Sequence, residues 1–259
     1  MSTALKLQEG ADYIAPCMPT TVTTEFLVNN GYIPDRNSGF PLFVAVELSY
    51  ACNLQCAHCY SYSSSSRVQE PTLALNDWKA IFCQYRRAGS IGIQFLGGEP
   101  TINPMIHDLL DHSAKIGFSL IEVFSNGYSF NIDVARRVAR ANGILTISLL
   151  STSESIHDDF SGRRGSFART LANIERYVHE GVNVHVALIT EGSEAANLIE
   201  TKSLLSSFGV KKVSVSPTVR VGRSKKGVDL QVRQSTCLGC KGSTAFIDSM
   251  GRRRSCVFS

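Results

Sequence analysis

The chain has 259 residues, of which 26 are basic and 22 acidic, for a formal net charge of +4. Charged residues make up only 19% of the sequence, so the chain is neither mainly a disordered acidic tail nor mainly a polybasic nucleic-acid-binding protein. No apolar run approaches the roughly 20 residues of a membrane-spanning helix, and the N-terminus lacks the basic-then-apolar pattern of a secretion signal. We therefore expect a cytoplasmic protein of one large domain or two modest ones, with no membrane partner.

Short apolar strands alternate with amphipathic helices along the chain. In order, the strand-like segments are residues 42–48, 91–96, 120–124, 144–150, 182–189 and 210–216. Apolar stripes at helical spacing begin at Trp78, Ile106, Phe167 and Leu204, and we expect helix ends at Gly89, Gly117, Gly143, Gly181 and Gly209. Strands that alternate with helices predict a parallel sheet with right-handed crossovers.

Polar side chains recur on the strand face that should point away from the helices, at Glu47, Gln94, Glu122, Ser214 and Ser216. A closed eight-stranded barrel fills its interior mainly with branched aliphatic residues. Six strands with a polar inner face instead predict an α/β fold of the partial (β/α)6 TIM-like barrel type, holding a polar ligand. An open doubly wound sheet and a sheet with one solvated face are the alternatives.

The composition divides the chain into three regions. Residues 1–40 have little periodicity and are expected to form an N-terminal extension. Residues 41–224 carry the strand–helix pattern of the barrel. After Arg223 the composition shifts to Gly, Ser, Lys and Arg, so residues 225–259 are expected to form a short cysteine-containing C-terminal extension.

Three cysteines crowd into one loop directly after the first strand: Cys52, Cys56 and Cys59, with the spacing C-x3-C-x2-C. Disulfides are rare in reducing compartments, so this spacing indicates metal binding or catalysis. Iron–sulfur clusters that serve as stable electron carriers usually take four thiolates, and structural zinc sites also close four ligands. Three cysteines therefore leave one coordination position for a ligand that is not protein.

A second signal follows the second strand, where the sequence reads Gly97-Gly98-Glu99-Pro100. Glycines without side chains let the backbone approach a ligand closely, and the carboxylate that follows can accept from a bound ammonium group. Taken alone, these four residues are only a turn sequence.

Together, the cysteine spacing and the Gly-Gly-Glu-Pro turn resemble the radical S-adenosylmethionine (SAM) superfamily, and the resemblance covers residues 42–223. It implies that Cys52, Cys56 and Cys59 bind a [4Fe-4S] cluster, with SAM chelating the fourth iron. It also implies that SAM contacts His58, Gly97, Gly98, Glu99, Pro100, Ser125, Asn126 and Ser148. A zinc knuckle with His58 as fourth ligand is the alternative, although its adjacency to Cys59 makes chelation by both awkward.

Residues 157–162 resemble a segment of the peptide-modifying members of this superfamily, in which an arginine precedes the glycine. This chain departs from that pattern, because Ser161 precedes Gly162 and the arginines Arg163 and Arg164 follow. A helix-entry loop is the structural alternative for this segment.

The C-terminal extension carries Cys237, Cys240 and Cys256. This spacing resembles the opening of the SPASM and twitch extensions, and the auxiliary site of the molybdenum-cofactor cyclase family, which implies a second, auxiliary iron–sulfur cluster. The later cysteines of a full SPASM domain are absent from the sequence, so an auxiliary cluster with an open position, a vestigial site and a fragment of a longer chain are the alternatives. Half a zinc ribbon is a further alternative.

By resemblance, the chain is an enzyme that accepts one electron from a flavodoxin- or ferredoxin-type donor and cleaves SAM to methionine and a 5′-deoxyadenosyl radical. That radical takes hydrogen from a peptide or a small natural-product precursor. A sugar or nucleoside antibiotic intermediate is an alternative substrate. A non-catalytic iron–sulfur or zinc protein that senses redox state or binds nucleic acid is the alternative from another class, and no nucleic-acid partner is expected. The sequence assigns no residue to the hydrogen transfer itself.

Overall fold

The computed structural model of the chain describes residues 41–189, 195–224, 244–254 and 256. One sheet runs through this part, in the strand order β6-β5-β4-β3-β2-β1-β7-β8. Its first six strands are β1 (Phe43–Glu47), β2 (Gly92–Leu96), β3 (Leu120–Ser125), β4 (Ile144–Leu149), β5 (Val184–Ile189) and β6 (Lys212–Ser216). They pair parallel with their chain neighbours and the sheet does not close on itself, so the predicted α/β partial barrel is confirmed.

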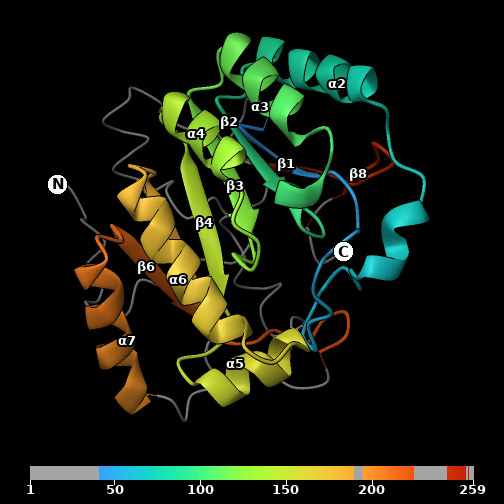
Figure 1. The fold of residues 1–259 in the computed structure, drawn as a ribbon. Coiled ribbons are helices and arrows are strands. Elements are labelled where there is room, and N and C mark those ends of the chain that lie inside the picture. Colours follow the sequence, from blue (N-terminus) through green and yellow to red (C-terminus); the bar gives the residue numbers. More distant parts are fainter. Residues whose placement is uncertain (1–40, 190–194, 225–243, 255, 257–259) are drawn as a thin grey trace, which may run out of the picture.

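Helices connect the parallel strands. They are α2 (Leu75–Arg87), α3 (Ile106–Lys115), α4 (Ile132–Arg140), α5 (Glu154–Ser161), α6 (Ser166–His179) and α7 (Ala195–Ser207), with short 3-10 turns η1 (Ser65–Gln69) and η2 (Pro100–Ile102). Right-handed crossovers place successive helices on the same face of a sheet, and Figure 1 shows α3, α4 and α6 lying side by side over the strands. Within the described residues, no helix has the length and apolar character needed to cross a membrane.

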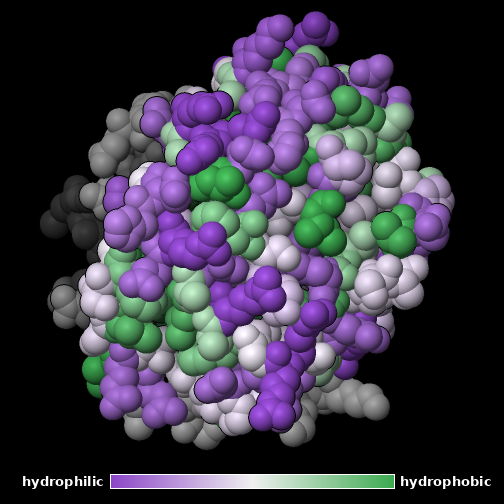
Figure 2. All heavy atoms as spheres, viewed as in Figure 1, coloured by the Kyte–Doolittle hydropathy of each residue, from purple (hydrophilic) through white to green (hydrophobic). Residues whose placement is uncertain are grey.

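The main core lies between the sheet and these helices. Alternate strand residues point into it, among them Val44, Val46, Ile93, Phe95, Ile121, Val123, Leu145 and Ile147. The predicted helix stripes meet them, and Trp78 and Phe82 of α2 are fully buried there. The outer faces of the helices are mostly hydrophilic, and Figure 2 shows apolar side chains only in separate spots on this side of the molecule. This arrangement follows from the 3.6-residue period of the apolar positions.

The opposite face of the sheet carries the polar side chains that the strand pattern predicts. At one end Phe43, Ile91, Leu120 and Ile144 form a small apolar cluster. Beyond this cluster, the Glu122 carboxylate accepts hydrogen bonds from Gln94 Nε2 (2.8 Å) and Thr146 Oγ1 (2.5 Å). All three side chains are buried, so the alternative of a solvated sheet face is wrong at this level. A buried carboxylate needs such donors, because water no longer solvates it.

The sheet has two strands more than the six that the sequence predicts. β7 (Thr244–Ile247) pairs parallel with β1 on the edge opposite β2, and β8 (Arg253–Arg254) pairs antiparallel with β7. Segments of four and two residues are too short to show a periodicity of two, which is why the sequence pattern missed them. Part of the predicted C-terminal extension therefore lies in the same sheet as the barrel strands.

Helix ends follow the predicted glycines. Positive φ angles occur at Gly89 (103°), Gly117 (89°), Gly181 (76°) and Gly209 (93°). A helix also ends before Gly143 as predicted, since α4 stops at Arg140, but the left-handed residue at this end is Asn142 (φ 50°). Gly143 serves close packing instead, because a Cβ there would lie 2.5 Å from the carbonyl oxygen of Ile121.

Candidate functional site

The cysteine loop leaves the carboxyl end of β1, where ligands bind in open parallel α/β sheets. It is tied back on itself by hydrogen bonds from Cys52 N to Ser64 O (3.1 Å) and from Ser64 N to Tyr50 O (3.2 Å). Cys52 is buried, Cys56 and Cys59 are half-buried, and all three are free thiols. The loop therefore holds three cysteine sulfurs in one short segment, none of them in a disulfide.

Two of the sulfurs already receive hydrogen bonds. Cys52 Sγ accepts from the backbone N of Leu54 (3.4 Å) and from Nδ2 of Asn126 (3.6 Å). Cys59 Sγ accepts from the backbone N of Ser63 (3.3 Å). Donors aimed at a sulfur favour its thiolate form, and they tune the sulfur ligands of iron–sulfur clusters.

Burial and the repulsion between neighbouring thiolates control the protonation of Cys52 and Cys56. Burial raises the pKa of Cys52 to about 11 and that of Cys56 to about 12, and the negative charges of Cys52 and Cys59 also act on Cys56. The three sulfurs are therefore within electrostatic reach of one another. Cys52 and Cys56 therefore keep their protons at neutral pH unless a cationic centre displaces them, as a bound metal group does.

The arrangement of the sulfurs bears on which metal group they fit. In the described part of the chain, no three His, Cys, Asp or Glu side chains are arranged to hold one metal ion. A tetrahedral zinc site needs four ligands about 2.0–2.3 Å from a single ion. A [4Fe-4S] cluster instead takes each thiolate on a different iron, so its sulfurs do not have to converge on one point. Whether the loop holds a cluster or zinc stays a prediction.

His58 lies within the same loop and is half-buried, with its ring centroid 5.5 Å from that of Phe160. Burial, together with the positive charge of Arg223, lowers the pKa of His58 to about 4. The ring is therefore neutral at physiological pH, as a flat partner for an adenine would be. That role stays a prediction.

The Gly-Gly-Glu-Pro turn packs directly against the cysteine loop. Gly97 has a φ of 115°, and a Cβ on Gly98 would overlap the carbonyl group of Ala51. The turn is fixed by hydrogen bonds from Gly98 N to Ser49 O (2.8 Å) and from Glu99 N to Ala51 O (2.9 Å). Both glycines are thus needed for contact with the loop that carries the cysteines.

Glu99 joins the ends of two strands. Its Oε1 accepts from the backbone N (3.1 Å) and the hydroxyl (2.6 Å) of Thr101, and its Oε2 accepts from the backbone N of Asn126 (2.7 Å). Burial raises the pKa of Glu99, and these hydrogen bonds oppose that rise. The carboxylate is therefore a structural link as well as a predicted acceptor for the SAM ammonium group, and Pro100 begins the η2 turn after it.

Asn126 connects this link to the cysteines. Besides its contact with Cys52, its Nδ2 donates to Oδ1 of Asn53 (2.7 Å). Ser125 is buried, and its hydroxyl accepts from Gly127 N (3.0 Å). Ser148 is half-buried near the end of β4. The structure thus brings the predicted residues of β2 and β3 to the cysteine loop, whereas contacts of these residues with SAM stay predictions.

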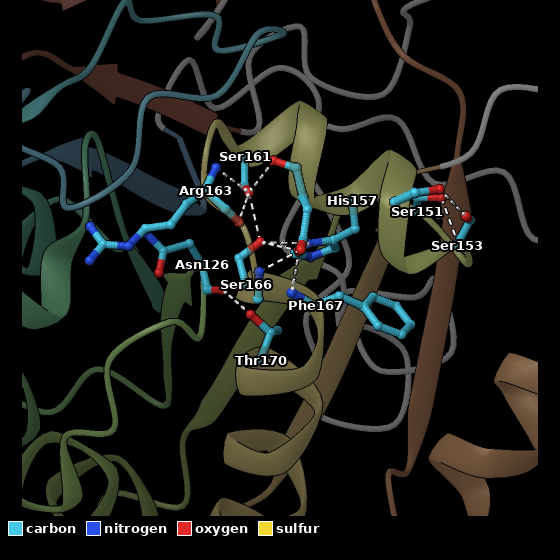
Figure 3. Close-up of polar contacts among 12 residues, drawn as sticks. Asn126, Ser151, Ser153, His157, Ser161, Arg163, Ser166, Phe167 and Thr170 are labelled. Atoms are coloured by element: carbon cyan, nitrogen blue, oxygen red, sulfur yellow. Dashed lines mark hydrogen bonds and ion pairs between the residues drawn. The ribbon is translucent and has the colours of Figure 1, made fainter.

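Residues 157–162 form the last turn and cap of α5, so the alternative of a helix-entry loop is wrong. Gly162 caps the helix with a φ of 68°. Ser161 is fully buried, and its hydroxyl donates to Asp158 O (2.9 Å) and lies 2.6 Å from Ser166 Oγ, as Figure 3 shows. Its side chain therefore closes the turn into α6.

The end of α5 also supports the cysteine loop from outside. The backbone N of Gln55 donates to Ser161 O (3.3 Å), and the backbone N of Ala57 donates to Phe160 O (2.7 Å). These bonds fix the segment between Cys52 and Cys59 against a helix.

Arg223 also contacts the site, although it was not predicted as a site residue. Its Nε donates to Cys56 O (2.7 Å), across 167 residues of sequence. Sequence patterns describe neighbours along the chain, so they give no sign of such a contact.

Of the predicted tail ligands, Cys237 and Cys240 lie outside the described residues. Cys256 is half-buried shortly after β8. The auxiliary cluster therefore stays a prediction.

Comparison with known proteins places this geometry in a family. The family model of the Radical SAM superfamily matches residues 46–201. The subtilosin biosynthesis protein AlbA of Bacillus subtilis is 28% identical over 187 residues, which cover 71% of this chain and 41% of AlbA. The mycofactocin maturase MftC of Mycobacterium tuberculosis is 30% identical over 207 residues, which cover 76% of this chain and 49% of MftC. The chain thus spans less than half the length of these curated relatives.

Solved structures show the same fold. Streptococcus suis SuiB bound to S-adenosylmethionine matches with a TM-score of 0.72 and 18% identity, over 85% of this chain and 61% of SuiB. SuiB bound to its precursor peptide SuiA matches with a TM-score of 0.70 and 15% identity, over 95% of this chain and 68% of SuiB. Since the family model covers more than half of the sequence, the chain belongs to the radical SAM superfamily, whose members use a [4Fe-4S] cluster and SAM.

Proposed function

We propose that this chain contains the catalytic barrel of a radical SAM enzyme that modifies a peptide. The observation that carries the proposal is the contact between Asn126 and Cys52, which joins the cysteine loop to the Glu99 turn at the carboxyl ends of β1, β2 and β3. Sulfur donors and a buried carboxylate thus meet at one edge of a parallel sheet, where such folds bind cofactors.

Cys52, Cys56 and Cys59 would hold the cluster, and the turn at residues 97–100 with Asn126 would hold SAM. When bound, this pair of cofactors supplies a one-electron cleavage of SAM and a carbon radical that takes hydrogen from the substrate. The chain itself supplies the hydrogen bonds to Cys52 and Cys59 and a rigid carboxylate at Glu99. The buried polar residues around Glu122 supply hydrogen-bonding groups on the inner face of the sheet.

A peptide is the substrate class that the relatives favour. AlbA takes part in subtilosin biosynthesis, MftC is a mycofactocin maturase, and SuiB has been solved with its precursor peptide SuiA. For this chain the peptide is our inference, supported by similarity over the barrel.

The remaining partners and the compartment follow from the same chemistry. A flavodoxin- or ferredoxin-type donor would supply the electron. We propose that the enzyme works in the cytoplasm, because disulfides are rare in reducing compartments and the cysteine spacing of this chain is of a metal-binding kind. Cys237, Cys240 and Cys256 would hold an auxiliary cluster.

Anaerobic reconstitution with iron and sulfide, followed by dithionite and SAM, tests the chemistry. We expect 5′-deoxyadenosine to form in the wild type and to be lost in Cys56→Ala. Cys83→Ala is the matched control, since Cys83 contacts His112 between α2 and α3, away from the loop, and it should retain activity. A cluster that assembles but never cleaves SAM would favour the redox-sensor alternative.

The substrate class needs a separate experiment. A precursor peptide encoded beside this chain, deuterated at carbon, should pass deuterium into 5′-deoxyadenosine and change in mass. Transfer from a sugar or nucleoside, with none from the peptide, would overturn the substrate assignment.

A further inference from the structure

The segment that follows β6 is fastened to the cysteine loop by a single arginine. Arg223 donates from its backbone N to Cys59 O (3.0 Å), from Nε to Cys56 O (2.7 Å) and from a terminal guanidinium nitrogen to Ser63 O (2.8 Å). Two of these three acceptors are carbonyl groups of the cysteines themselves. The third belongs to Ser63, whose backbone N–H donates to Cys59 Sγ. One side chain thus spans the loop from its middle to its end.

The preceding residue explains how the two backbones come so close. Gly222 has a φ of 56°, and a Cβ there would lie 2.5 Å from Tyr60 O and 2.6 Å from Tyr60 Cα, and would overlap Cys59 O. In return, the Tyr62 hydroxyl donates to Gly222 O (2.8 Å). No other residue type fits this contact, because any side chain would push the segment off the loop.

The positive charge of Arg223 lies beside the same cysteine loop. The acceptors of its hydrogen bonds are neutral carbonyl groups, and none of the ion pairs among the described residues involves it. The half-buried guanidinium lies against the backbone of Cys56, to whose carbonyl oxygen its Nε donates (2.7 Å). A positive charge beside sulfur ligands stabilises negative charge on them.

We propose that Gly222 and Arg223 form a clamp that holds the cysteine loop in its cluster-binding conformation and places a positive charge beside the cluster. Arg223 is thus a positioning residue, and this inference rests on the proposed function. The planar fork of arginine reaches the carbonyls of Cys56 and Ser63 at once, whereas a lysine would carry the charge without the fork.

Three variants separate the parts of the clamp. Arg223→Gln removes both the positive charge and the guanidinium that bonds two carbonyl groups at once. Arg223→Lys keeps the charge without that paired bonding. Gly222→Ala pushes the segment at residues 222–223 off the cysteine loop. Arg220→Gln is the matched control, because Arg220 is an exposed arginine three residues earlier in the same segment.

Amide hydrogen exchange of residues 52–64 in the metal-free chain tests the mechanical part. In Arg223→Gln and Gly222→Ala these residues should exchange at least about tenfold faster than in the wild type, because both variants lose contacts between Arg223 and the loop, and one hydrogen bond from a charged donor is already worth about that factor. Arg220→Gln should match the wild type. Equal exchange in all four proteins would overturn the clamp.

Reconstituted protein tests the link to the cluster. The iron content of Arg223→Gln should fall most of the way to that of Cys56→Ala. The cluster that remains should have a more negative midpoint potential than in the wild type, because the reduced cluster carries more negative charge and the variant lacks the positive charge that stabilises it. Arg223→Lys should keep the wild-type potential at reduced iron content. A wild-type potential in Arg223→Gln would overturn the role of the charge. If the wild type itself binds no iron, the proposed function fails, while the exchange measurement still decides whether the clamp exists.

Discussion

The Glu99 carboxylate satisfies three donors that would otherwise be buried without partners. In Glu99→Gln, the side-chain oxygen of the glutamine can still accept from Thr101. Its NH2 group then faces the backbone N–H of Asn126, so two donors meet and the N–H of Asn126 loses its acceptor. We expect a loss of about 1–3 kcal/mol in the free energy of unfolding, measured by urea denaturation. Glu70→Gln is the control, because Glu70 pairs with Arg67 at the surface, and it should change stability far less. Equal effects of the two substitutions would contradict the structural role of Glu99.

His157 makes the stability of the protein depend on pH. Its side chain is buried, and this burial lowers its pKa to about 4 from an ordinary value of 6.5. Between these values the unfolded chain binds the proton and the folded chain does not, so stability is present above pH 6.5 and falls as the pH drops toward 4. His157→Gln should reduce the loss between pH 7 and pH 5 by about 2 kcal/mol in urea titrations. The exposed His179→Gln should leave the slope unchanged, and an unaltered slope in His157→Gln would contradict the assignment.

At this scale, the sequence reveals residues whose partners lie close along the chain or whose spacing is diagnostic. Cys52, Cys56 and Cys59 and the turn at residues 97–100 are of this kind. Arg223 is not, because its partners are 160 and 167 residues away and any exposed loop can contain an arginine.

The turn between α5 and α6 is held by the Asp158 carboxylate. It accepts from the backbone N of Phe167 (2.9 Å) and from the Ser166 hydroxyl (3.1 Å), and also from Gly165 N, so it caps the start of α6. Asp158→Ala should cost about 1–2 kcal/mol of stability, as lost N-caps do. It should also speed hydrogen exchange at Gln55 and Ala57, which donate to the end of α5.

Asp159→Ala provides the comparison for this element. Asp159 is the exposed neighbour of Asp158, and its removal should change neither stability nor exchange. If both substitutions loosen residues 55–57 equally, the cap does not support the cysteine loop.

Elements with a clear period could be predicted from the sequence, and irregular ones could not. All six long strands lie within two residues of their expected bounds. α5 went unpredicted because its 8 residues carry polar side chains on most faces, and β7 and β8 because 4 and 2 residues are too few to show alternation. Short elements are decided by tertiary contacts, which local patterns do not contain.

Across the whole molecule, sheet order decides which predictions could succeed. β1 to β6 lie in chain order, so motifs at the ends of consecutive strands become neighbours, as Cys52, Glu99 and Asn126 do. β7 breaks that order by pairing on the far side of β1, and it brings the C-terminal region back to the strand that leads into the cysteine loop. The barrel was therefore predictable, whereas the place of residues 244–254 was not.

The most direct measurement of the central claim is the electron paramagnetic resonance spectrum of the anaerobically reconstituted, reduced chain, recorded with and without SAM. We predict a signal of a reduced [4Fe-4S] cluster that changes when SAM is added. This SAM-sensitive signal should disappear in a variant with Cys52, Cys56 and Cys59 replaced by alanine, in which only a signal of the auxiliary cluster, unchanged by SAM, can remain. It should persist in Cys83→Ala. A SAM-sensitive signal without these three cysteines, or a wild-type signal that SAM leaves unchanged, would contradict the account.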